Sequence, residues 1–553
     1  MMSSVSSLAF PSAVGHIIDI VNQADYDLLK VKLYLSGMGL VVLIGSLSTF
    51  IRTSQLSLVN EIVSRNLRKE VFTSILLHRT DFFVRNSAGL LVARLANDTV
   101  IVATTLTENI SRFLKSTFSG IFCSYLLFRI SPKLMSFATT ILPILALFTV
   151  VYGRYRKKAT QDLLTALSKE TQVSTESFTG IRAIQSFVQE KFAYKRYCTA
   201  VNQSFQIARK MALVEGLFLG GGTLTSQATM IYVLFKGSML LSENIITIGS
   251  LTSFCMYTGY LFINVSQLGV SISEFMKAQG ASKRVFSLID SGNALKDLPK
   301  KDVLPDDHTP ELKFENVHFS FPQSLESEIL DGVTFSIRPG EKVAITGQSG
   351  CGKSTIASLL LRYYDPTKGK IFYGGKNIEE LDISWLRKQI AEVSQVSYLF
   401  SGTIAENISL SRSDDNFYSL EDLVKAAQSA KADEFIRKLE KNYFFQVGES
   451  GGNLSGGQRQ KISIARCLYS TAGLVVCDEP TSALDAREKR TVTNSLLKHL
   501  THRTAFIITH DLNILKAVDR VILLEKGKVI GNAPFSELVK TNEAFSKLSA
   551  YFF

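Results

Sequence analysis

Long apolar runs before about residue 275 restrict the fold of this chain more than any other feature, and 134–152 (LMSFATTILPILALFTVVY) is typical of them. A helix that spans a bilayer needs about 20 mostly apolar residues. Four or five segments of the chain qualify: 33–51, 113–130, 134–152, 214–235 and 249–272. The residues after these runs have the composition of a soluble α/β domain. The 553 residues therefore predict at least two domains, one of them in a membrane.

The first residues, 1–21 (MMSSVSSLAFPSAVGHIIDIV), form only a marginal span, because five serines, a proline and a histidine interrupt the apolar stretch. We interpret them as the end of a longer first helix, with a true start upstream favoured over a shortened form of the protein. No amphipathic Arg-rich presequence precedes the stretch, so targeting cannot be read from it.

The connections between the apolar segments are of two kinds. Segments 113–130 and 134–152 are joined by ISPK alone, which predicts a tight hairpin, whereas 52–112 and 153–213 are long, charged and poor in Gly and Pro. If 153–210 were one continuous helix, it would extend on the order of 85 Å, far beyond a bilayer. The alternative, two separate soluble inserts, lacks turn clusters. We therefore expect helices that continue outside the membrane.

The formal net charge of +12 is compatible with a nucleic-acid surface or with a membrane flank. The basic residues collect between apolar segments, as in 152–158 (YGRYRKK) and 190–197 (EKFAYKRY), and form no basic patch with interleaved aromatic residues. This favours a membrane flank and places both long connections on one side of the bilayer. We expect no nucleic-acid partner.

The six cysteines form no CxxC pair and have no His-rich partner, which argues against a disulfide framework or a zinc site. They are Cys123, Cys198, Cys255, Cys351, Cys467 and Cys477.

A polar, proline-bearing linker follows the last apolar run. We expect a membrane domain of about five to six helices over 1–290, the linker over 291–311 and a soluble domain over 312–553. The soluble domain opens on 312–321 (LKFENVHFSF), which alternates apolar and polar residues like a strand.

The residues 342–364 read as a strand (KVAITG), a Gly-rich loop (QSGCGKST) and a helix (IASLLLRYY), which is the setting of a phosphate site. Three glycines let backbone amides approach the β- and γ-phosphates: Gly347, Gly350 and Gly352. Lys353 reaches the same oxygens, and the Ser354 hydroxyl is a predicted Mg²⁺ ligand. The helix that follows directs its positive dipole end at the anion.

Two further strands end in polar residues that suit hydrolysis. The stretch 473–485 (GLVVCDEPTSALD) places Asp478 to hold Mg²⁺ and Glu479 to polarise a water for attack on the γ-phosphate. An Asp–Glu pair is usually a solvated surface, but here it follows four apolar residues. The strand TAFIITH ends in His510, where contact with the γ-phosphate is favoured over a satisfied core histidine.

A second Gly-rich stretch, 451–460 (GGNLSGGQRQ), lies roughly a hundred residues after the first. It packs four glycines, a Ser and a Gln into one polar run. Converging backbone amides of this kind are a usual phosphate cradle. One chain thus carries two candidate phosphate-binding loops.

These motifs resemble those of the ATP-binding-cassette (ABC) transporters, and the resemblance covers nearly the whole chain. GQSGCGKST resembles the Walker A loop, LVVCDE the Walker B strand, LSGGQ (454–458) the signature and SALD (482–485) the D-loop. In the same comparison Gln395, in VSQVSYLF, is the Q-loop glutamine and His510 the switch histidine. The resemblance adds the rest of the Walker A loop to the predicted ATP site: Gln348, Ser349, Cys351 and Thr355.

In this family two nucleotide domains meet head to tail, which explains the second cradle. Four signature residues are then expected on an ATP held by the Walker A loop of a partner chain: Ser455, Gly456, Gly457 and Gln458. The resemblance implies Glu479, His510 and Gln395 as catalytic residues, and it adds Gln395 to Ser354 and Asp478 as Mg²⁺ ligands. The residue that stacks on adenine, commonly Tyr in the family, is Phe321, and stacking needs only the ring face.

Upstream, 82–99 (FFVRNSAGLLVARLANDT) and 174–190 (STESFTGIRAIQSFVQE) resemble the two coupling-helix regions of exporters. The domain order is that of the exporter B subfamily. The segments 152–172 and 275–290 are similar to its mitochondrial inner-membrane half-transporters, although peptide transporters of the subfamily are similar there too. The resemblance implies an α-helical multi-pass domain followed by an α/β P-loop domain on the matrix side. It also implies a dimer, with a homodimer favoured over a heterodimer.

The function implied is ATP-driven export of a solute, with ATP and Mg²⁺ required. A membrane-bound regulatory ATPase that gates a partner is the alternative, but it would be expected to show degenerate catalytic residues or extra partner-binding segments. A soluble repair or translation ATPase would carry tandem cassettes. Several polar residues lie in the apolar runs, where helix packing explains them better than cargo binding: Ser119, Thr140, Thr225, Ser226, Asn264 and Ser266. Peptides, tetrapyrrole-like compounds and lipids all stay open as cargo.

Overall fold

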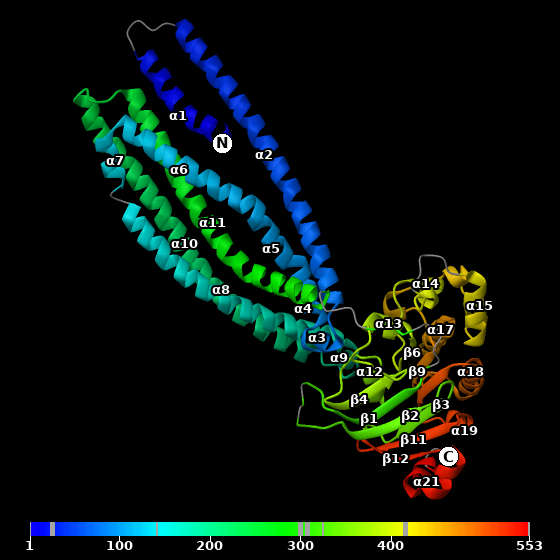
Figure 1. Cartoon of the computed structure of the whole chain (residues 1–553). Coiled ribbons are helices and arrows are strands. Elements are labelled where there is room, and N and C mark those ends of the chain that lie inside the picture. The colour runs from blue at the N-terminus through cyan, green and yellow to red at the C-terminus, as the bar shows by residue number, and fades with distance from the viewer. Residues whose placement is uncertain are drawn as a thin grey trace. The chain divides into compact units, whose positions relative to one another are not determined.

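The computed structural model describes residues 2–22, 28–139, 142–296, 302–304, 310–322, 324, 326–412 and 419–550. It divides into two compact units, shown as a ribbon in Figure 1. The first unit holds Met1–Leu76 and Gly89–Asn293, and the second holds Leu77–Ala88 and Ala294–Phe553. Parts of the predicted linker 291–311, namely 297–301 and 305–309, lie outside the described residues.

The first unit is built of long helices (Figure 1). They are α1 (Met2–Val21), α2 (Leu28–Leu76), α4 (Ala88–Ala93), α5 (Thr99–Thr104), α6 (Ile110–Ile130), α7 (Pro132–Thr139), α8 (Leu142–Thr179), α9 (Ile181–Ser186), α10 (Glu190–Ser242) and α11 (Ile248–Lys296). Two π-helical turns, η1 (Arg94–Asp98) and η2 (Thr105–Asn109), join α4, α5 and α6 into one stretch over Ala88–Ile130.

Two helices among the described residues are apolar and long enough to cross a membrane. They are Leu28–Leu76 and Ala88–Ile130, whose most apolar stretches have mean hydropathies of 1.8 and 1.3. The predicted segments 33–51 and 113–130 lie in these two helices, whereas 214–235 and 249–272 lie in α10 and α11, which are less apolar. Segment 134–152 lies partly outside the described residues.

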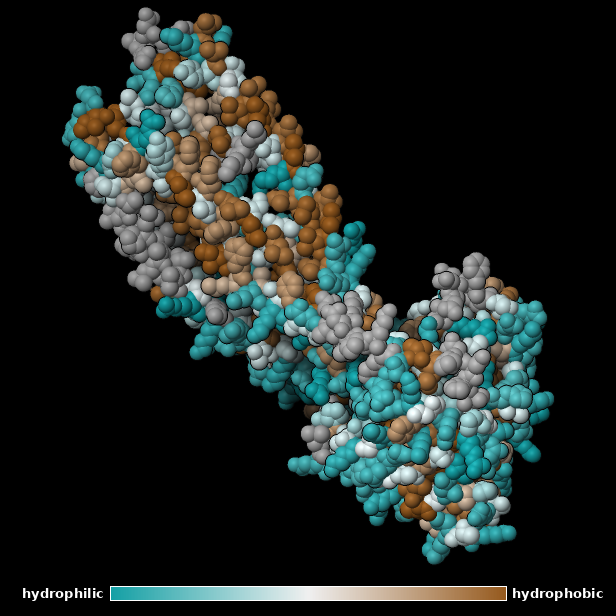
Figure 2. All heavy atoms as spheres, in the orientation of Figure 1, coloured by the Kyte–Doolittle hydropathy of each residue, from teal (hydrophilic) through white to brown (hydrophobic). Residues whose placement is uncertain are grey.

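The surface of the first unit is rich in hydrophobic side chains, which Figure 2 shows gathered over its helices. On α2, for example, Leu33, Leu43 and Phe50 are 72%, 71% and 70% exposed. Contiguous exposed apolar surface of this kind marks contact with lipid or with another protein.

Two polar residues of the apolar segments bond to the backbone of their own helix. The Thr225 hydroxyl donates to Gly221 O at 2.7 Å and the Asn264 amide to Tyr260 O at 2.8 Å, each one turn back along its own helix. Ser119 is buried. Thr140 lies outside the described residues. These contacts need no bound cargo.

The charged stretch 153–213 is helical but not one continuous helix. It runs along α8, turns at the short α9 and returns along α10. The turn contains Gly180 and ends at Val188, whose φ of 54° is left-handed and cannot be part of a helix. The segment that resembles the second coupling-helix region is thus the tip of a helical hairpin.

The second unit is an α/β fold around a six-stranded sheet in the order β12-β11-β3-β10-β9-β6. A four-stranded sheet, β2-β1-β4-β5, and the pair β7-β8 complete the β-structure. The strands are β1 (Leu312–Phe319), β2 (Leu330–Ile337), β3 (Lys342–Gly347), β4 (Lys368–Tyr373), β5 (Lys376–Asn377), β6 (Ile390–Val393), β7 (Gly402–Thr403), β8 (Gln446–Val447), β9 (Leu474–Asp478), β10 (Thr504–Ile508), β11 (Arg520–Glu525) and β12 (Lys528–Ala533).

Helices cover both faces of this sheet (Figure 1). The helices of the unit are α3 (Thr80–Arg85), α12 (Lys353–Leu360), α13 (Ile383–Lys388), α14 (Ile404–Ser409), α15 (Leu420–Ser429), α16 (Asp433–Lys438), η3 (Asn442–Phe444), η4 (Glu449–Gly451), α17 (Gly456–Tyr469), α18 (Ala486–His499), α19 (Leu512–Ala517), α20 (Phe535–Thr541) and α21 (Glu543–Ala550).

The central strands separate two hydrophobic cores. Along β9, Val475 and Cys477 join one core while Leu474 and Val476 join the other. A strand covered on both faces has to be apolar at successive positions, which is why GLVVC reads as a continuous apolar run. The strands β6, β9, β10, β3 and β11 are parallel, so their carboxyl ends lie along one edge of the sheet.

Candidate functional site

The carboxyl edge of the parallel sheet collects the polar residues that the motifs single out. The strand β3 ends at Gly347, β9 ends at Asp478 and β10 ends two residues before His510. Gln395 follows β6 by two residues. Ligands of α/β proteins bind outside the carboxyl ends of such strands.

The first Gly-rich loop connects β3 to α12 and wraps around the ammonium group of Lys353. This side chain is buried and donates to Gly347 O at 2.9 Å and to Gln348 O at 2.8 Å. Gly347 has a φ of +151°, and a Cβ there would lie 2.0 Å from Leu524 O. Only glycine fits this position, which brings the loop against β11. The predicted strand, loop and helix are all present.

Asp478 and Ser354 meet next to this loop. Burial raises the pKa of Asp478, and a hydrogen bond from Ser354 acts in the opposite direction. The Oδ1 atom of Asp478 is buried and has no hydrogen-bond partner among the described residues. A carboxylate oxygen without a partner, beside a hydroxyl, is the oxygen donor set that Mg²⁺ prefers. The two residues therefore fit a divalent cation.

Glu479 is held in a strained conformation directly after β9. Its φ of 47° is left-handed, which costs a residue with a Cβ roughly 1–2 kcal/mol. Its amide donates to Ile508 O at 2.9 Å, which pins the peptide to β10. Strain that the surrounding structure maintains is a frequent property of functional residues.

Gln395 and His510 both approach the Glu479 carboxylate. Gln395 Nε2 lies 3.4 Å from Oε2, and His510 Nε2 lies 3.7 Å from Oε1. The pKa of His510 is lowered, first by burial and then by the charge of Lys353. The imidazole is therefore neutral at neutral pH. The structure thus brings together the three residues expected to be catalytic.

Phe321 lies just after β1 in a cluster of aromatic rings. Its ring centroid is 5.0 Å from that of Phe319 and 5.4 Å from that of Tyr364, both in edge-on arrangements. The side chain is half-buried. These edge-on neighbours hold the ring in place.

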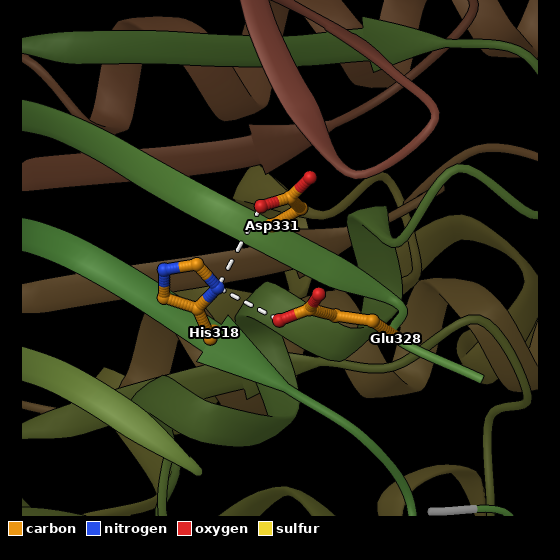
Figure 3. A group of neighbouring side chains, drawn as sticks. All are labelled: His318, Glu328 and Asp331. Atoms are coloured by element: carbon orange, nitrogen blue, oxygen red, sulfur yellow. Dashed lines mark hydrogen bonds and ion pairs between the residues drawn. The ribbon is translucent and has the colours of Figure 1, made fainter. Parts of the chain in front are cut away.

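A group of titratable side chains, His318, Glu328 and Asp331, lies between β1 and the start of β2 (Figure 3). His318 Nδ1 is 2.7 Å from Glu328 Oε1 and 3.6 Å from Asp331 Oδ1. Lys528 Nζ lies 2.9 Å from the other Asp331 oxygen and lowers the pKa of that carboxyl. Because an ammonium already neutralises Asp331, we interpret the group as an ion-pair clasp across this hairpin. It was not identified from the sequence.

The signature segment forms the start of a helix. Ser455 is the N-cap of α17, and its hydroxyl accepts from Gln458 N at 3.2 Å while Gln458 Oε1 accepts from Ser455 N at 2.9 Å. The hydrogen bonds of these two side chains thus form a capping box. Backbone amides at the N-terminus of a 14-residue helix are well placed for an anion. Gly457 packs against the D-loop, where a Cβ would lie 3.3 Å from Ala483 O.

Sequence reasoning missed Gln460, five residues after the N-cap. Its side chain is 1% exposed and bonds both Glu479 and the D-loop. No motif interpretation assigns it a role, and its only signal in the sequence is a polar residue at the start of a largely apolar helix face.

Comparison with known proteins agrees with this architecture. Residues 1–265 match the family described as ABC transporter transmembrane region, and residues 330–482 match the family described as ABC transporter. The chain is 33% identical over 552 residues to ATP-binding cassette sub-family B member 10, mitochondrial, of Mus musculus, covering 99% of this chain and 77% of that protein. It is 31% identical to ATP-dependent permease MDL1, mitochondrial, of Saccharomyces cerevisiae, covering 98% and 79%.

A solved structure described as a bacterial Atm1-family ABC exporter with ATP bound superposes with a TM-score of 0.87 at 25% sequence identity, covering 100% of this chain and 96% of that one. The two family matches, the relatives and the solved structure all indicate the same family. The chain therefore belongs to the ABC transporter family, as an exporter-type half-transporter of the B subfamily that couples ATP hydrolysis to solute export across a membrane.

Proposed function

We propose that two copies of this chain form a homodimer with two composite ATP sites, and that hydrolysis at these sites drives export of the solute. The observation that carries the proposal is the approach of Gln395 and His510 to the strained Glu479, at 3.4 Å and 3.7 Å. The three side chains lie along the sheet edge where the phosphate loop also ends. The residues that we propose for phosphate binding and for water activation thus lie along the same edge of the sheet.

In the proposed reaction Glu479 orients the attacking water and accepts its proton. His510, as a neutral imidazole, donates a hydrogen bond toward the γ-phosphate. Lys353 leaves the carbonyl oxygens of Gly347 and Gln348 and binds phosphate oxygens. The rest of the loop contributes backbone amides and hydroxyls to the nucleotide: Ser349, Gly350, Cys351, Gly352, Ser354 and Thr355. Phe321 stacks on the adenine.

The Mg²⁺ ion that we propose would be held by Ser354, Asp478 and Gln395. When bound, such an ion neutralises charge on the β- and γ-phosphate oxygens. The buried Oδ1 atom of Asp478 without a partner supports this assignment most directly. The side chain of Gln395, which reaches Glu479, would link the ion to the catalytic carboxylate.

The second cradle would act on the partner's nucleotide, through Ser455, Gly456, Gly457 and Gln458. Exposed apolar residues support an interface between copies. Val396, Tyr398 and Phe400, beside Gln395, are 79%, 54% and 54% exposed. At the tip of the α8–α10 hairpin, Phe187 and Val188 are 75% and 78% exposed. We propose that this tip presses on the partner's nucleotide domain.

The segment Leu77–Ala88 supports the proposal for the first coupling-helix region. It belongs to the second unit, where Arg79 forms an ion pair with Asp365. Asp365 also accepts from Arg362 Nε at 3.2 Å, and Arg362 follows the C-terminal end of α12. A movement of the segment would thereby reach the helix that begins at the phosphate loop.

We further propose the mitochondrial inner membrane as the location, with the nucleotide domain on the matrix side, because two relatives carry the word mitochondrial in their names. We assign 1–290 to the membrane domain, 291–311 to the linker and 312–553 to the nucleotide domain. A regulatory ATPase without cargo is less well supported, because the relatives are named as a permease and an exporter.

The ATPase rate of this chain alone, purified into lipid nanodiscs, tests the homodimer and its chemistry. We expect turnover that depends on Mg²⁺ and falls a hundredfold or more with Glu479→Gln. Bound ATP without turnover in the unsubstituted chain would mean that a different partner completes the sites. Uptake of candidate solutes into sealed vesicles, with the matching stimulation of ATPase, separates export from regulation.

A further inference from the structure

The buried amide of Gln460 lies between the signature helix and the catalytic carboxylate but takes no part in the proposed chemistry. It belongs to the first turns of α17, which begins with the signature glycines. Burying an amide is costly unless its donors and acceptor are satisfied, so its partners are informative.

The partners of Gln460 lie on the segment that leaves β9. Its Nε2 donates to Glu479 O at 3.1 Å and approaches Ser482 Oγ at 3.4 Å, and its Oε1 accepts from Ala483 N at 2.9 Å. One side chain thus bonds the strained residue and both of the first two D-loop residues. The side-chain amide thus uses both its nitrogen as a donor and its oxygen as an acceptor.

Glu479 is held from two sides as a result. Its amide is bonded to β10 through Ile508 O at 2.9 Å, and its carbonyl is bonded to α17 through Gln460. A left-handed residue relaxes unless the surrounding structure maintains it. Gln460 supplies a side-chain restraint on this peptide, beside the backbone bond from Ser482 N at 3.2 Å.

The same amide connects α17 to the D-loop, and close packing strengthens the connection. Gly457 approaches Ala483 O, and a Cβ there would lie 3.3 Å from that oxygen and 3.2 Å from Leu484 Cδ2. One residue after Gln460, Lys461 Nζ is 2.6 Å from Glu488 Oε1, on the helix that follows the D-loop. A displacement of α17 therefore moves the D-loop and the Glu479 peptide with it.

We propose that Gln460 is a positioning residue that transmits contact between the signature helix and the partner's ATP to Glu479, which acts on the ATP of its own chain. The inference rests on the proposed head-to-tail dimer and on the proposed role of Glu479. It identifies the hydrogen bonds of Gln460 as the contacts through which nucleotide binding at one composite site affects hydrolysis at the other.

A double-mutant cycle on the full-length chain in nanodiscs tests the link, with MgATP as substrate. We expect Gln460→Met to lower kcat at least tenfold and to bring the Hill coefficient for ATP close to one. The Kd for fluorescently labelled ATP should change less than twofold. In the Glu479→Gln background, the added Gln460→Met should cause no further loss, because both changes remove the same function.

A kcat within twofold of the unsubstituted chain would overturn the proposal, and so would losses that multiply in the double variant, since Gln460 would then act independently of Glu479. Gln460→Glu decides the case if the Met variant does not fold. It keeps the acceptor for Ala483 N and the side-chain size but loses the donors to Glu479 and Ser482. We expect the same loss of kcat, and full activity would overturn the proposal.

Gln428→Met is the matched control. Gln428 lies exposed on α15, where its Nε2 bonds Asp433 at 3.4 Å, and its loss should leave kcat within twofold. The Glu479→Gln variant by itself separates the two failures. If that variant hydrolyses ATP normally, the proposed function fails, whereas normal hydrolysis by the Gln460 variants alone contradicts only the link.

Discussion

The two Gly-rich loops of this chain, which we propose bind phosphate, differ in what surrounds them. The loop over 347–355 has the buried ammonium of Lys353 and the buried carboxylate of Asp478 beside it, and its three glycines have positive φ angles that residues with a Cβ rarely adopt. The signature over 454–458 has no charged side chain. Its Ser455 and Gln458 satisfy each other in a capping box.

This difference indicates that the two loops have different functions in nucleotide binding. The first loop can bind a triphosphate within one chain, because charge, backbone amides and cation ligands meet there. The second offers only the amides at a helix N-terminus, whose electrostatic contribution to anion binding is typically 0.3–1 kcal/mol. We infer that it adds contacts to a nucleotide already held elsewhere, and the following predictions test that division.

The largest effect is expected from a substitution in the second loop alone. Ser455→Arg should abolish measurable hydrolysis while ATP affinity stays within twofold, because the nucleotide of the same chain does not depend on this loop. Steady-state ATPase and labelled-ATP binding measure the two quantities. Ser419→Arg is the control. Ser419 is also a helix N-cap, at the start of α15, and we expect its substitution to leave the rate of ATP hydrolysis unchanged. An unaffected rate for Ser455→Arg would exclude the head-to-tail arrangement.

Glu479→Gln should reduce hydrolysis a hundredfold or more, using general-base effects of roughly 10²–10⁴ as a guide. ATP should be retained, because the phosphate loop is unchanged. Retention is measured by the nucleotide that co-purifies with the chain after gel filtration. Near-normal turnover would remove Glu479 from its proposed role.

One glycine substitution in each loop tests whether the two loops differ in their need for glycine. Gly347→Ala should destabilise the nucleotide domain by about 1–3 kcal/mol and weaken ATP binding at least tenfold, because its φ is +151° and its Cβ would clash with Leu524 O. Gly456→Ala, which lies in the signature and would meet Ala483 Cβ only at 3.7 Å, should change stability by about 0.5 kcal/mol or less. Chemical denaturation measures both, and equal costs would contradict the distinction between the loops.

A smaller effect concerns the adenine. Phe321→Ala should weaken ATP binding roughly fivefold to tenfold, taking about 1 kcal/mol for the loss of base stacking. Phe321→Tyr should bind ATP as the unsubstituted chain does, because the ring face is kept. Isothermal titration calorimetry with ATP and with inorganic triphosphate distinguishes stacking from a general loss of the loop. A matching loss for triphosphate would rule out stacking as the cause.

The smallest expected effect is on pH dependence. Because burial lowers the pKa of His510, its imidazole is neutral at pH 7 and becomes charged only below its ordinary value of 6.5. We expect kcat to be level above pH 7 and to fall only as the pH drops below 6.5, where the neutral form is lost. Turnover at saturating MgATP in overlapping buffers measures this. A rise toward acid pH would mean that protonated His510 is the active form.

Much of this architecture could be predicted because it is local. The strand, loop and helix at 342–364 are encoded by an apolar run, a glycine-rich turn and a second periodic run, and all three are present. The predicted spans 33–51 and 113–130 lie in apolar helices for the same reason. The predicted spans in α10 and α11 were harder to recognise, because they are less apolar. In α10, for example, the Thr225 hydroxyl bonds to the backbone of its own helix, so a polar residue is accommodated there.

Other features depend on residues that are far apart. The turn of the 153–213 stretch at α9 includes Gly180 and the left-handed residue Val188, and no periodicity signals it. The clasp of His318 with Glu328 depends on the register of β1 against β2. Such contacts are set by strand pairing and packing, which a local pattern does not encode.

By itself, the sequence determined that this chain is a membrane protein with a Walker A-like loop, an Asp–Glu pair after an apolar run and a signature, because each is a short motif in a recognisable setting. Only the tertiary structure decided that Gln395 and His510 approach Glu479, that this residue is strained and that Gln460 holds its carbonyl. The parallel register of β6, β9, β10 and β3 brings these residues to one edge. That register results from packing two hydrophobic cores against one sheet, and it is a property of the whole domain.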